Sequence, residues 1–350
     1  MKILVTGSAG FIAFHLSKRL ASEGNEVVSL DNINDYYGTT IKYDRLQQLG
    51  FRKEQIEYNK LVTSETFPNH RFIKLDLTDR EKLHTLFEQE KFEFVVNLAA
   101  QAGVRYSIEN PYTYLESNIE GFLNIIEGCR NNPVKHLVFA SSSSVYGMNT
   151  GYPFSVDVNV DHPLSLYAAS KKSNELMAHS YSYLYQLPVT GLRFFTAYGP
   201  WGRPDMALFI FTKAILEEKP IDIYNHGNMM RDFTFIEDLI EGIVRIIQHV
   251  AEPDETWDSD SPTPSTSSVP YQLYNIGNNS PVKLLDFIDA IEEALGKKAI
   301  RNYMPLQIGD ISKTYADVDK LVNDVGYKPG TPIKKGVEAF VSWYRDYFKV

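Results

Sequence analysis

The sequence predicts an α/β protein with a doubly wound parallel sheet and a smaller C-terminal α/β domain. Short apolar segments alternate with amphipathic ones through the first half of the chain, a glycine-rich turn directly follows the first apolar segment, and an acidic residue ends the second. Alternating strands and helices form a parallel sheet whose ligand binds at the carboxyl ends of the strands. We expect a first domain over residues 1–195 and a second over 196–350, with segments near 232–250 packing back on the first.

The composition is that of an ordinary globular protein. The chain has 350 residues, enough for two domains, of which 43% are hydrophobic and 23% charged. Its net charge of −9, without a basic run, argues against nucleic acid and anionic membrane partners. No signal peptide and no apolar run of about 18 residues is found, so we expect a cytoplasmic protein. Cys129 is the only cysteine, which excludes an internal disulfide and a cysteine metal cluster. It lies in an apolar helical pattern, which predicts core packing.

The glycine-rich turn predicts a dinucleotide site. Gly7 and Gly10 stand between a strand at 2–6 and a helix, and a second strand ends at Asp31. Gly7 permits the tight turn, and Gly10 lets the backbone approach a pyrophosphate at the helix N-terminus. Ala13, which replaces the usual third glycine, adds one methyl group. The Asp31 carboxylate would accept hydrogen bonds from the adenosine ribose and repel a 2′-phosphate, so we expect NAD and not NADP.

The rest of the first half continues the alternation. Strands are expected at 71–75, 94–98 and 137–140, helices at 79–90 and 111–131, and a polar insertion with one amphipathic helix at 34–70. Asp76 and Leu77 would meet the adenine, and the mostly small residues Ala99–Gly103, after the strand that ends at Leu98, would let a cofactor lie against the strand end. Asn118 belongs either to the polar face of a helix or to the support of the active-site backbone.

Two further motifs predict acid/base chemistry. Tyr167 and Lys171 are four residues apart and share one helix face, where an ammonium group stabilises a phenolate. In a chain with 22 tyrosines this spacing also describes an ordinary helix surface. Residues 141–144 are four serines that follow a strand. Their hydroxyls either bind a substrate hydroxyl or developing carbonyl, or form a serine-rich loop.

Together with Arg193-x-Phe195, these motifs resemble the extended short-chain dehydrogenase/reductase family of nucleotide-sugar enzymes, which have a Rossmann fold. The resemblance covers nearly the whole chain. It implies that Tyr167, Lys171 and Ser142 are catalytic, because the family's catalytic hydroxyl lies 25 residues before the tyrosine. The cofactor site implied by the motifs and the resemblance comprises Gly7, Gly10, Phe11, Ile12, Asp31, Asn32, Asp76, Leu77, Leu98, Ala99, Ala100, Gln101, Asn118, Tyr167, Lys171 and Phe195.

Ser143 and Ser144 separate the branches of this family. The sugar 4,6-dehydratases carry an Asp-Glu pair at these positions and the UDP-glucuronate decarboxylases a Glu at the second, whereas this chain has no carboxylate there. Runs at 99–107, 193–206 and 224–227 are similar to the UDP-glucuronate 4-epimerases. The resemblance implies an NAD-dependent isomerase that interconverts UDP-glucuronate and UDP-galacturonate through a 4-keto intermediate, within nucleotide-sugar metabolism and polysaccharide biosynthesis.

The second half is expected to bind the UDP-sugar. Thr196 stands where galactose-type epimerases have Asn, and with Arg203 and Ser142–Ser144 it would hold the sugar carboxylate. Alternatively, Arg203 is a solvated loop residue. The resemblance implies that Arg231 contacts the diphosphate. It also places Gln307 and Asp310 in a nucleotide-binding run, although related epimerases have Arg at position 307.

Three other interpretations remain open from the sequence. The enzyme could be a 4-epimerase of another UDP-sugar, such as UDP-glucose/galactose or a UDP-N-acetylhexosaminuronate. Less favoured is a decarboxylase or dehydratase, for want of the carboxylates. A protein that only senses dinucleotide would commonly lack the Tyr-x3-Lys motif. The resemblance also implies a homodimer that pairs the helices at 111–131 and 166–185, unless their apolar stripe belongs to the intramolecular core.

Overall fold

The structure is a computed structural model that describes residues 1–307 and 309–350. Two compact units are formed. The first comprises Met1–Asn149, Val156–Arg193 and Ile243–Tyr274, and the second comprises Thr150–Ser155, Phe194–Gly242 and Asn275–Val350. The assignment of separate functions to residues 1–195 and 196–350 stays a prediction.

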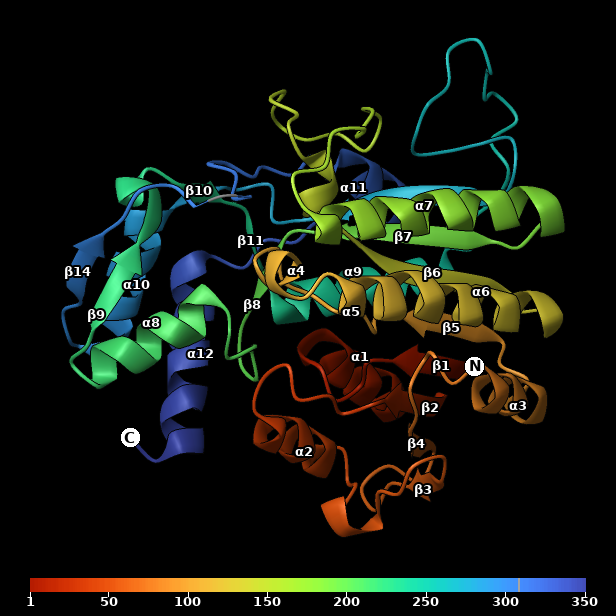
Figure 1. The fold of residues 1–350 in the computed structure, drawn as a ribbon, viewed down its shortest axis with the longest axis horizontal. Helices are drawn as coiled ribbons and strands as arrows, with labels where there is room; N and C mark the ends of the chain where they lie inside the picture. Colours follow the sequence, from red (N-terminus) through yellow and green to blue (C-terminus); the bar gives the residue numbers. More distant parts are fainter. Residues whose placement is uncertain (308) are drawn as a thin grey trace. The chain divides into compact units, whose positions relative to one another are not determined.

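The predicted doubly wound sheet is confirmed. Its eight strands have the order β12-β7-β6-β5-β1-β2-β4-β3 (Figure 1). β1 pairs in parallel with β2 and β5, β2 with β4, and β5 with β6, whereas β3 is antiparallel to β4. The strand order reverses between β1 and β5, where such sheets bind ligands. The strands are β1 (Lys2–Thr6), β2 (Glu26–Asp31), β3 (Leu61–Thr63), β4 (His70–Lys74), β5 (Phe94–Asn97), β6 (His136–Ser142), β7 (Val189–Phe194) and β12 (Tyr271–Ile276).

The helices of the first unit begin and end as local chemistry dictates. Asp79 accepts a hydrogen bond from the Lys82 amide at the start of α3, and Ser165 accepts one from the Ala168 amide at the start of α7. Gln186 ends α7 in the left-handed conformation. α6 and α7 lie side by side (Figure 1). The longer helices of this unit are α1 (Phe11–Ser22), α2 (Thr39–Gln48), α3 (Arg80–Glu90), α6 (Gly121–Asn131) and α7 (Leu166–Tyr185).

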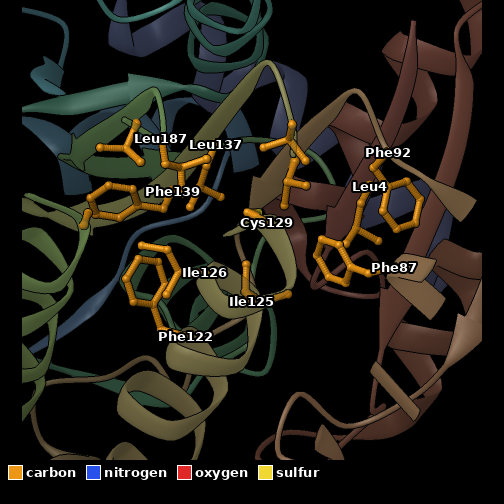
Figure 2. Packing of buried hydrophobic residues seen from close by; sticks show 14 of the residues in the cluster. Leu4, Phe87, Phe92, Phe122, Ile125, Ile126, Cys129, Leu137, Phe139 and Leu187 are labelled. Carbon is orange, nitrogen blue, oxygen red and sulfur yellow. The ribbon is translucent and has the colours of Figure 1, made fainter. Parts of the chain in front are cut away.

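The core of the first unit is apolar and holds the only cysteine. Figure 2 shows side chains of β1, α3, α6 and β6 packed together, among them Leu4, Phe87, Ile125 and Phe139. Cys129 is fully buried among them, and this burial raises the pKa of its thiol. The prediction that Cys129 packs in the core is confirmed.

The predicted helix at 111–131 is interrupted. Its residues form α5 (Tyr112–Tyr114), a π-helical turn η2 (Leu115–Glu120) and α6, and α4 (Tyr106–Glu109) precedes them. The insertion at 34–70 contains the expected helix, α2, but also a short 3-10 turn η1 (Lys53–Gln55) and the edge strand β3.

The second unit consists of short strand pairs and helices. β8 (Thr196–Tyr198) pairs with β11 (Phe233–Phe235), β9 (Pro220–Ile223) with β14 (Ile300–Tyr303), and β10 (Met230–Arg231) with β13 (Val282–Lys283). The sequence pattern did not predict β8, β10, β11 and β13, because strands of two or three residues show no alternation. The helices are α8 (Ala207–Leu216), α9 (Ile236–Gln248, shared with the first unit), α10 (Leu284–Leu295), α11 (Asp319–Val325) and α12 (Ile333–Phe348).

A buried carboxylate, Asp232, holds these pieces together. It is 0% exposed and accepts hydrogen bonds from the amides of Asn278 (2.7 Å) and Ala316 (2.9 Å). Its own amide donates to the Thr314 hydroxyl. Burial raises the pKa of Asp232, against the effect of these amide hydrogen bonds.

No helix of the part of the chain that the structure describes is both long and apolar enough to cross a membrane.

Candidate active site

The glycine-rich turn has the geometry that a pyrophosphate needs. Gly7 has φ +80°, and a Cβ there would lie 2.9 Å from the Ala99 amide nitrogen. The Gly10 amide donates to the Gly7 carbonyl at 2.8 Å, and α1 begins at Phe11 without a side-chain cap. The first amides of α1 are therefore available to an anion. These residues fit a dinucleotide.

Asp31 supports this turn from the end of β2. Its carboxylate accepts hydrogen bonds from the amides of Ala9 (3.0 Å) and Ile33 (2.7 Å). Two oxygens offer about four acceptor sites, so capacity remains for ribose hydroxyls. Asn32 donates to Asp76 at 2.7 Å, which brings two of the predicted cofactor residues together. Burial raises the pKa of Asp76, but hydrogen bonds from Asn32 and Thr78 lower it more.

The insertion braces the same turn from the other side. Arg45 of α2 is 0% exposed and donates to the Ala9 carbonyl at 2.9 Å and to the Tyr37 hydroxyl at 2.8 Å. Lys42, also buried, donates to the Asn34 carbonyl at 2.7 Å. The amide and the carbonyl of Ala9 are thus both held, one by β2 and the other by the insertion.

Asn118 ties the end of β5 to α7. Its side chain accepts from the Gln101 amide (2.8 Å) and donates to the Gln101 carbonyl (3.0 Å) and to the Ser170 hydroxyl (2.9 Å). Asn174 donates to the Asn118 carbonyl, which lies in the π-helical turn. Asn118 is therefore not on a solvated polar face. Leu98, Ala99 and Ala100 are partly exposed at the end of β5.

Tyr167 and Lys171 lie in the first two turns of α7. Tyr167 is partly exposed beside Tyr114, with 6.1 Å between ring centroids. A helix N-terminus favours negative charge, as on a phenolate. The Lys171 ammonium is buried and donates to the Ala140 carbonyl at 3.0 Å. Burial lowers the pKa of Lys171 to about 8.

Ser142 is the last residue of β6. Its hydroxyl oxygen accepts a hydrogen bond from the Ser144 amide at 3.1 Å, so its proton is still available for donation to another oxygen. Ser143 and Ser144 are partly exposed in a 3-10 turn, η3 (Ser143–Tyr146). α7 packs against both β6 and η3, so the structure brings the serines beside the helix that carries Tyr167 and Lys171.

Five of the predicted residues lie in the second unit with Phe195, and their geometry is described within that unit. Phe195 is buried, and its amide donates to the Ile276 carbonyl. Thr196 begins β8 and is partly exposed. Arg203 makes a two-point hydrogen-bonded ion pair with Asp205, 3.0 Å from Nε to Oδ1. A ligand carboxylate would have to share or replace Asp205 there.

Arg231, Gln307 and Asp310 form the other part of this group. Arg231 is largely buried, and this burial lowers its pKa while the Asp310 carboxylate opposes the shift. The Asp310 amide donates to the Gln307 carbonyl. The buried Gln307 Oε1 has no hydrogen-bond partner among the described residues. An Arg, an acid and an amide that are close in this way can bind phosphate and ribose hydroxyls.

Residues 3–277 match the model of the NAD dependent epimerase/dehydratase family. The chain belongs to this family. It is 57% identical over 349 residues to Protein CapI of Staphylococcus aureus, covering 100% of both chains. It is 44% identical over 351 residues to a probable UDP-glucuronate 4-epimerase of Rhizobium meliloti, covering 100% of this chain and 98% of the other.

A solved structure has a similar fold. The UDP-glucuronic acid 4-epimerase of Bacillus cereus, crystallised with UDP-glucuronic acid and NAD, is 31% identical with a TM-score of 0.84. The match covers 99% of this chain and 100% of that chain. The resemblance to extended short-chain dehydrogenase/reductases of the UDP-glucuronate 4-epimerase group is confirmed.

Sequence reasoning missed the polar residues that support this family member's site. Glu175, Arg193 and Ser141 are buried, and Ser141 and Arg193 each donate a hydrogen bond to the Glu175 carboxylate. Two signals pointed to them: Glu175 continues the four-residue spacing of Tyr167 and Lys171, and Arg193 stands in an apolar strand, where a charge needs a partner. Within residues 1–307 and 309–350, no group of three or more His, Cys, Asp or Glu is placed to hold a metal ion.

Proposed function

We propose that the protein is a UDP-glucuronate 4-epimerase, which interconverts UDP-glucuronate and UDP-galacturonate through a 4-keto intermediate. One observation carries the choice of branch. Ser142 is followed by Ser143 and Ser144 in η3, beside the helix of Tyr167 and Lys171, so the site has an acid/base pair and a hydroxyl but no carboxylate at positions 143 and 144. Relatives from R. meliloti and Arabidopsis thaliana that bear this activity in their names support the proposal.

The cofactor is NAD, held by the Gly7–Gly10 turn, the first amides of α1 and Asp31. When bound, NAD supplies a hydride acceptor and donor for the sugar C4. The residues of the chain move the proton. Tyr167 as phenolate takes the C4 hydroxyl proton and later returns it, Lys171 stabilises the phenolate, and the Ser142 hydroxyl donates a hydrogen bond to the C4 oxygen. Because the 4-keto sugar can present either face, the configuration at C4 inverts without net redox change.

The second unit would bind the substrate. Arg203 and Thr196 would hold the sugar carboxylate, and Arg231, Gln307 and Asp310 the UDP moiety. A 4-keto uronate is a β-keto acid, which loses CO2 when the bond to the carboxylate aligns with the carbonyl π system. Holding the carboxylate out of that alignment is the function that we assign to Arg203 and Thr196. The first predicted domain would thus bind NAD, and the second mainly the UDP-sugar.

The functional molecule would be a cytoplasmic homodimer. Apolar side chains of η2 and α7 are exposed in the single chain, among them Leu115 (46%), Leu176 (58%) and Leu184 (63%). α6 and α7 are neighbours, so pairing with a second copy would form a four-helix bundle that covers these side chains. The single thiol, Cys129, is compatible with a reducing compartment.

The deciding experiment is to incubate the purified protein with UDP-glucuronate, without added NAD, and to follow C4 configuration and CO2 release by NMR. UDP-galacturonate without CO2 is the expected result, and it would also show that NAD stays bound through purification. UDP-pentose with CO2 would overturn the choice of branch. No reaction even with added NAD, together with turnover of UDP-glucose or an N-acetylated UDP-sugar, would assign the enzyme to another 4-epimerase.

A further inference from the structure

A buried ion pair joins α7 to β7. The side chains of Glu175 and Arg193 are 1% and 0% exposed, and they make a bidentate contact of 2.9 Å (Nε to Oε1) and 3.0 Å (NH2 to Oε2). The free energy lost when two charges are removed from water offsets much of the attraction between them. Apolar side chains can therefore often replace a buried ion pair without loss of stability. A gain in stability therefore does not by itself explain the pair.

The same carboxylate also binds the strand that ends in the serines. The Ser141 hydroxyl donates to Glu175 Oε1 at 2.7 Å, and the Lys172 ammonium donates to Oε2 at 3.3 Å. With the two bonds from Arg193, Glu175 receives four hydrogen bonds, which is what an ionised carboxylate can accept. Burial raises the pKa of Glu175, but Arg193, Lys172 and Ser141 together hold it below its ordinary value, so it stays charged.

Two successive residues of β6 are thereby fastened to two successive turns of α7. The Ala140 carbonyl accepts from Lys171, and the Ser141 hydroxyl donates to Glu175, four residues further along the same helix face. The next residue of β6 is Ser142. Because side chains of a strand alternate between its faces, a shift of one residue in this register would turn the Ser142 hydroxyl away from its face.

We propose that Glu175 and Arg193, acting through Ser141, are positioning residues that hold β6 in register against α7, so that Ser142 and Lys171 are aligned with the Tyr167 phenol. The pair touches neither sugar nor cofactor in this proposal. It acts by fixing the two elements that carry the reacting groups. The proposal rests on the proposed function only in naming Tyr167 as the acid/base group.

Ser141→Ala tests the link while the ion pair and the fold are kept. We expect kcat for UDP-glucuronate to fall ~10-fold or more, with KM and bound NAD unchanged, because a small misplacement of reacting groups is costly. We also expect the acid limb of the kcat–pH profile to move to higher pH by about one unit, because a displaced Lys171 stabilises the phenolate less. Ser141→Thr, which keeps the hydroxyl, should restore both.

Ser173→Ala is the matched control, since Ser173 lies on the same helix and its hydroxyl donates to the Ala169 carbonyl of that helix. It should leave kcat and the pH profile as in the wild type. A Ser141→Ala enzyme with wild-type kcat and pH profile would overturn the proposal. The proposal would also be overturned if kcat fell, the pH profile did not shift and Ser141→Thr did not restore kcat. That result would mean that the Ser141 hydroxyl has only a structural role.

A second readout needs no turnover and separates this proposal from the proposed function. The ionisation of Tyr167 is followed in the purified holoprotein by the ultraviolet absorbance of tyrosinate, with the Tyr167→Phe variant subtracted. In Ser141→Ala the Tyr167 titration should move to higher pH by about one unit. If UDP-glucuronate is not a substrate but this shift is found, the proposed substrate is wrong and the positioning role of Glu175 and Arg193 is supported. An unmoved titration overturns the pair whatever the substrate.

Discussion

At the scale of single residues, the buried ammonium of Lys171 links the pH to both folding and chemistry. Burial lowers its pKa in the folded protein to about 8, whereas in an unfolded chain a lysine has a pKa of about 10.4. Between these values the unfolded chain binds more protons than the folded chain. The free energy of unfolding contributed by this residue therefore rises with pH across the window from about 8 to about 10.4.

Comparison with Lys171→Met checks this sign. Urea unfolding of NAD-free wild type and variant, measured from pH 7.5 to 10 under otherwise equal conditions, gives a difference in unfolding free energy. We expect the wild type to gain on the variant as the pH rises above about 8. A difference that is constant with pH, or that changes in the opposite direction, would contradict a lowered Lys171 pKa.

Arg203 carries the second residue-scale prediction. Replacement by Gln should reduce kcat/KM for UDP-glucuronate ~100-fold, because a charge-assisted bond to a carboxylate contributes about 1.5–3 kcal/mol. The amount of NAD that copurifies should not change. Arg301→Gln is the control, because Arg301 also pairs with a carboxylate of the same unit, Asp289, outside the group of predicted substrate residues. Equal kinetics of the two variants would remove Arg203 from the site.

At the scale of elements, the sequence predicts what depends on local pattern. The strands β1, β2, β4, β5 and β6 and the helix α7 follow from short apolar runs, a glycine-rich turn and the Tyr-x3-Lys spacing, and each was located within a few residues. The edge strand β3 was not predicted. The π-helical turn at 115–120 was not predicted, because one extra residue per turn leaves almost the same apolar periodicity. Asn118, within this turn, makes its hydrogen bonds to residues of other segments, Gln101 and Ser170.

The buried polar residues around the site could not be predicted either, because their partners lie in distant segments of the chain. Arg45 in the insertion looks like a solvated residue in a polar helix, yet it is 0% exposed because the glycine-rich turn, 36 residues earlier, supplies its acceptor. The central position of Asp232 in the second unit could not be predicted, because its hydrogen-bond donors, the amides of residues 278 and 316, are distant in the sequence. Residue types and spacing identify reacting groups, whereas the groups that hold them are identified by contacts between distant segments.

Asn118→Ala tests whether the Asn118 side chain supports the end of β5 and the cofactor site. The substitution leaves the Gln101 amide and carbonyl without their side-chain partners, and an unsatisfied buried polar group costs about 1–3 kcal/mol. We expect a loss of that order in urea unfolding and faster NAD release during dialysis. Asn131→Ala, in an exposed position at the end of α6 where the side chain donates to the Glu127 carbonyl, should change neither. Wild-type NAD retention in Asn118→Ala would contradict its support of the cofactor site.

At the scale of the whole molecule, the exposed apolar side chains of α7 and η2 raise the question of whether this surface is solvated or forms an interface with a second copy. Leu176, Tyr183 and Leu184 are 58%, 63% and 63% exposed, and Leu115 is 46% exposed. Single exposed apolar side chains are ordinary on a protein surface, but a cluster on two adjoining elements is typical of an association site. The same face carries polar contacts, such as the hydrogen bond from Tyr181 to Glu127, that keep α6 and α7 together within one chain.

A charge placed in this cluster should separate the copies. Leu176→Glu would bury an unpaired carboxylate in a four-helix bundle, which costs several kcal/mol, but would be solvated without strain on a monomer. We therefore expect light scattering to give a dimer mass for the wild type and a monomer mass for the variant at micromolar concentration, with circular dichroism unchanged. Ile210→Glu is the matched control, because Ile210 is 47% exposed on α8, away from α7 and η2 in the sequence. A wild type that is itself monomeric would mean that the apolar cluster faces solvent, and a Leu176→Glu dimer would place the interface on another surface.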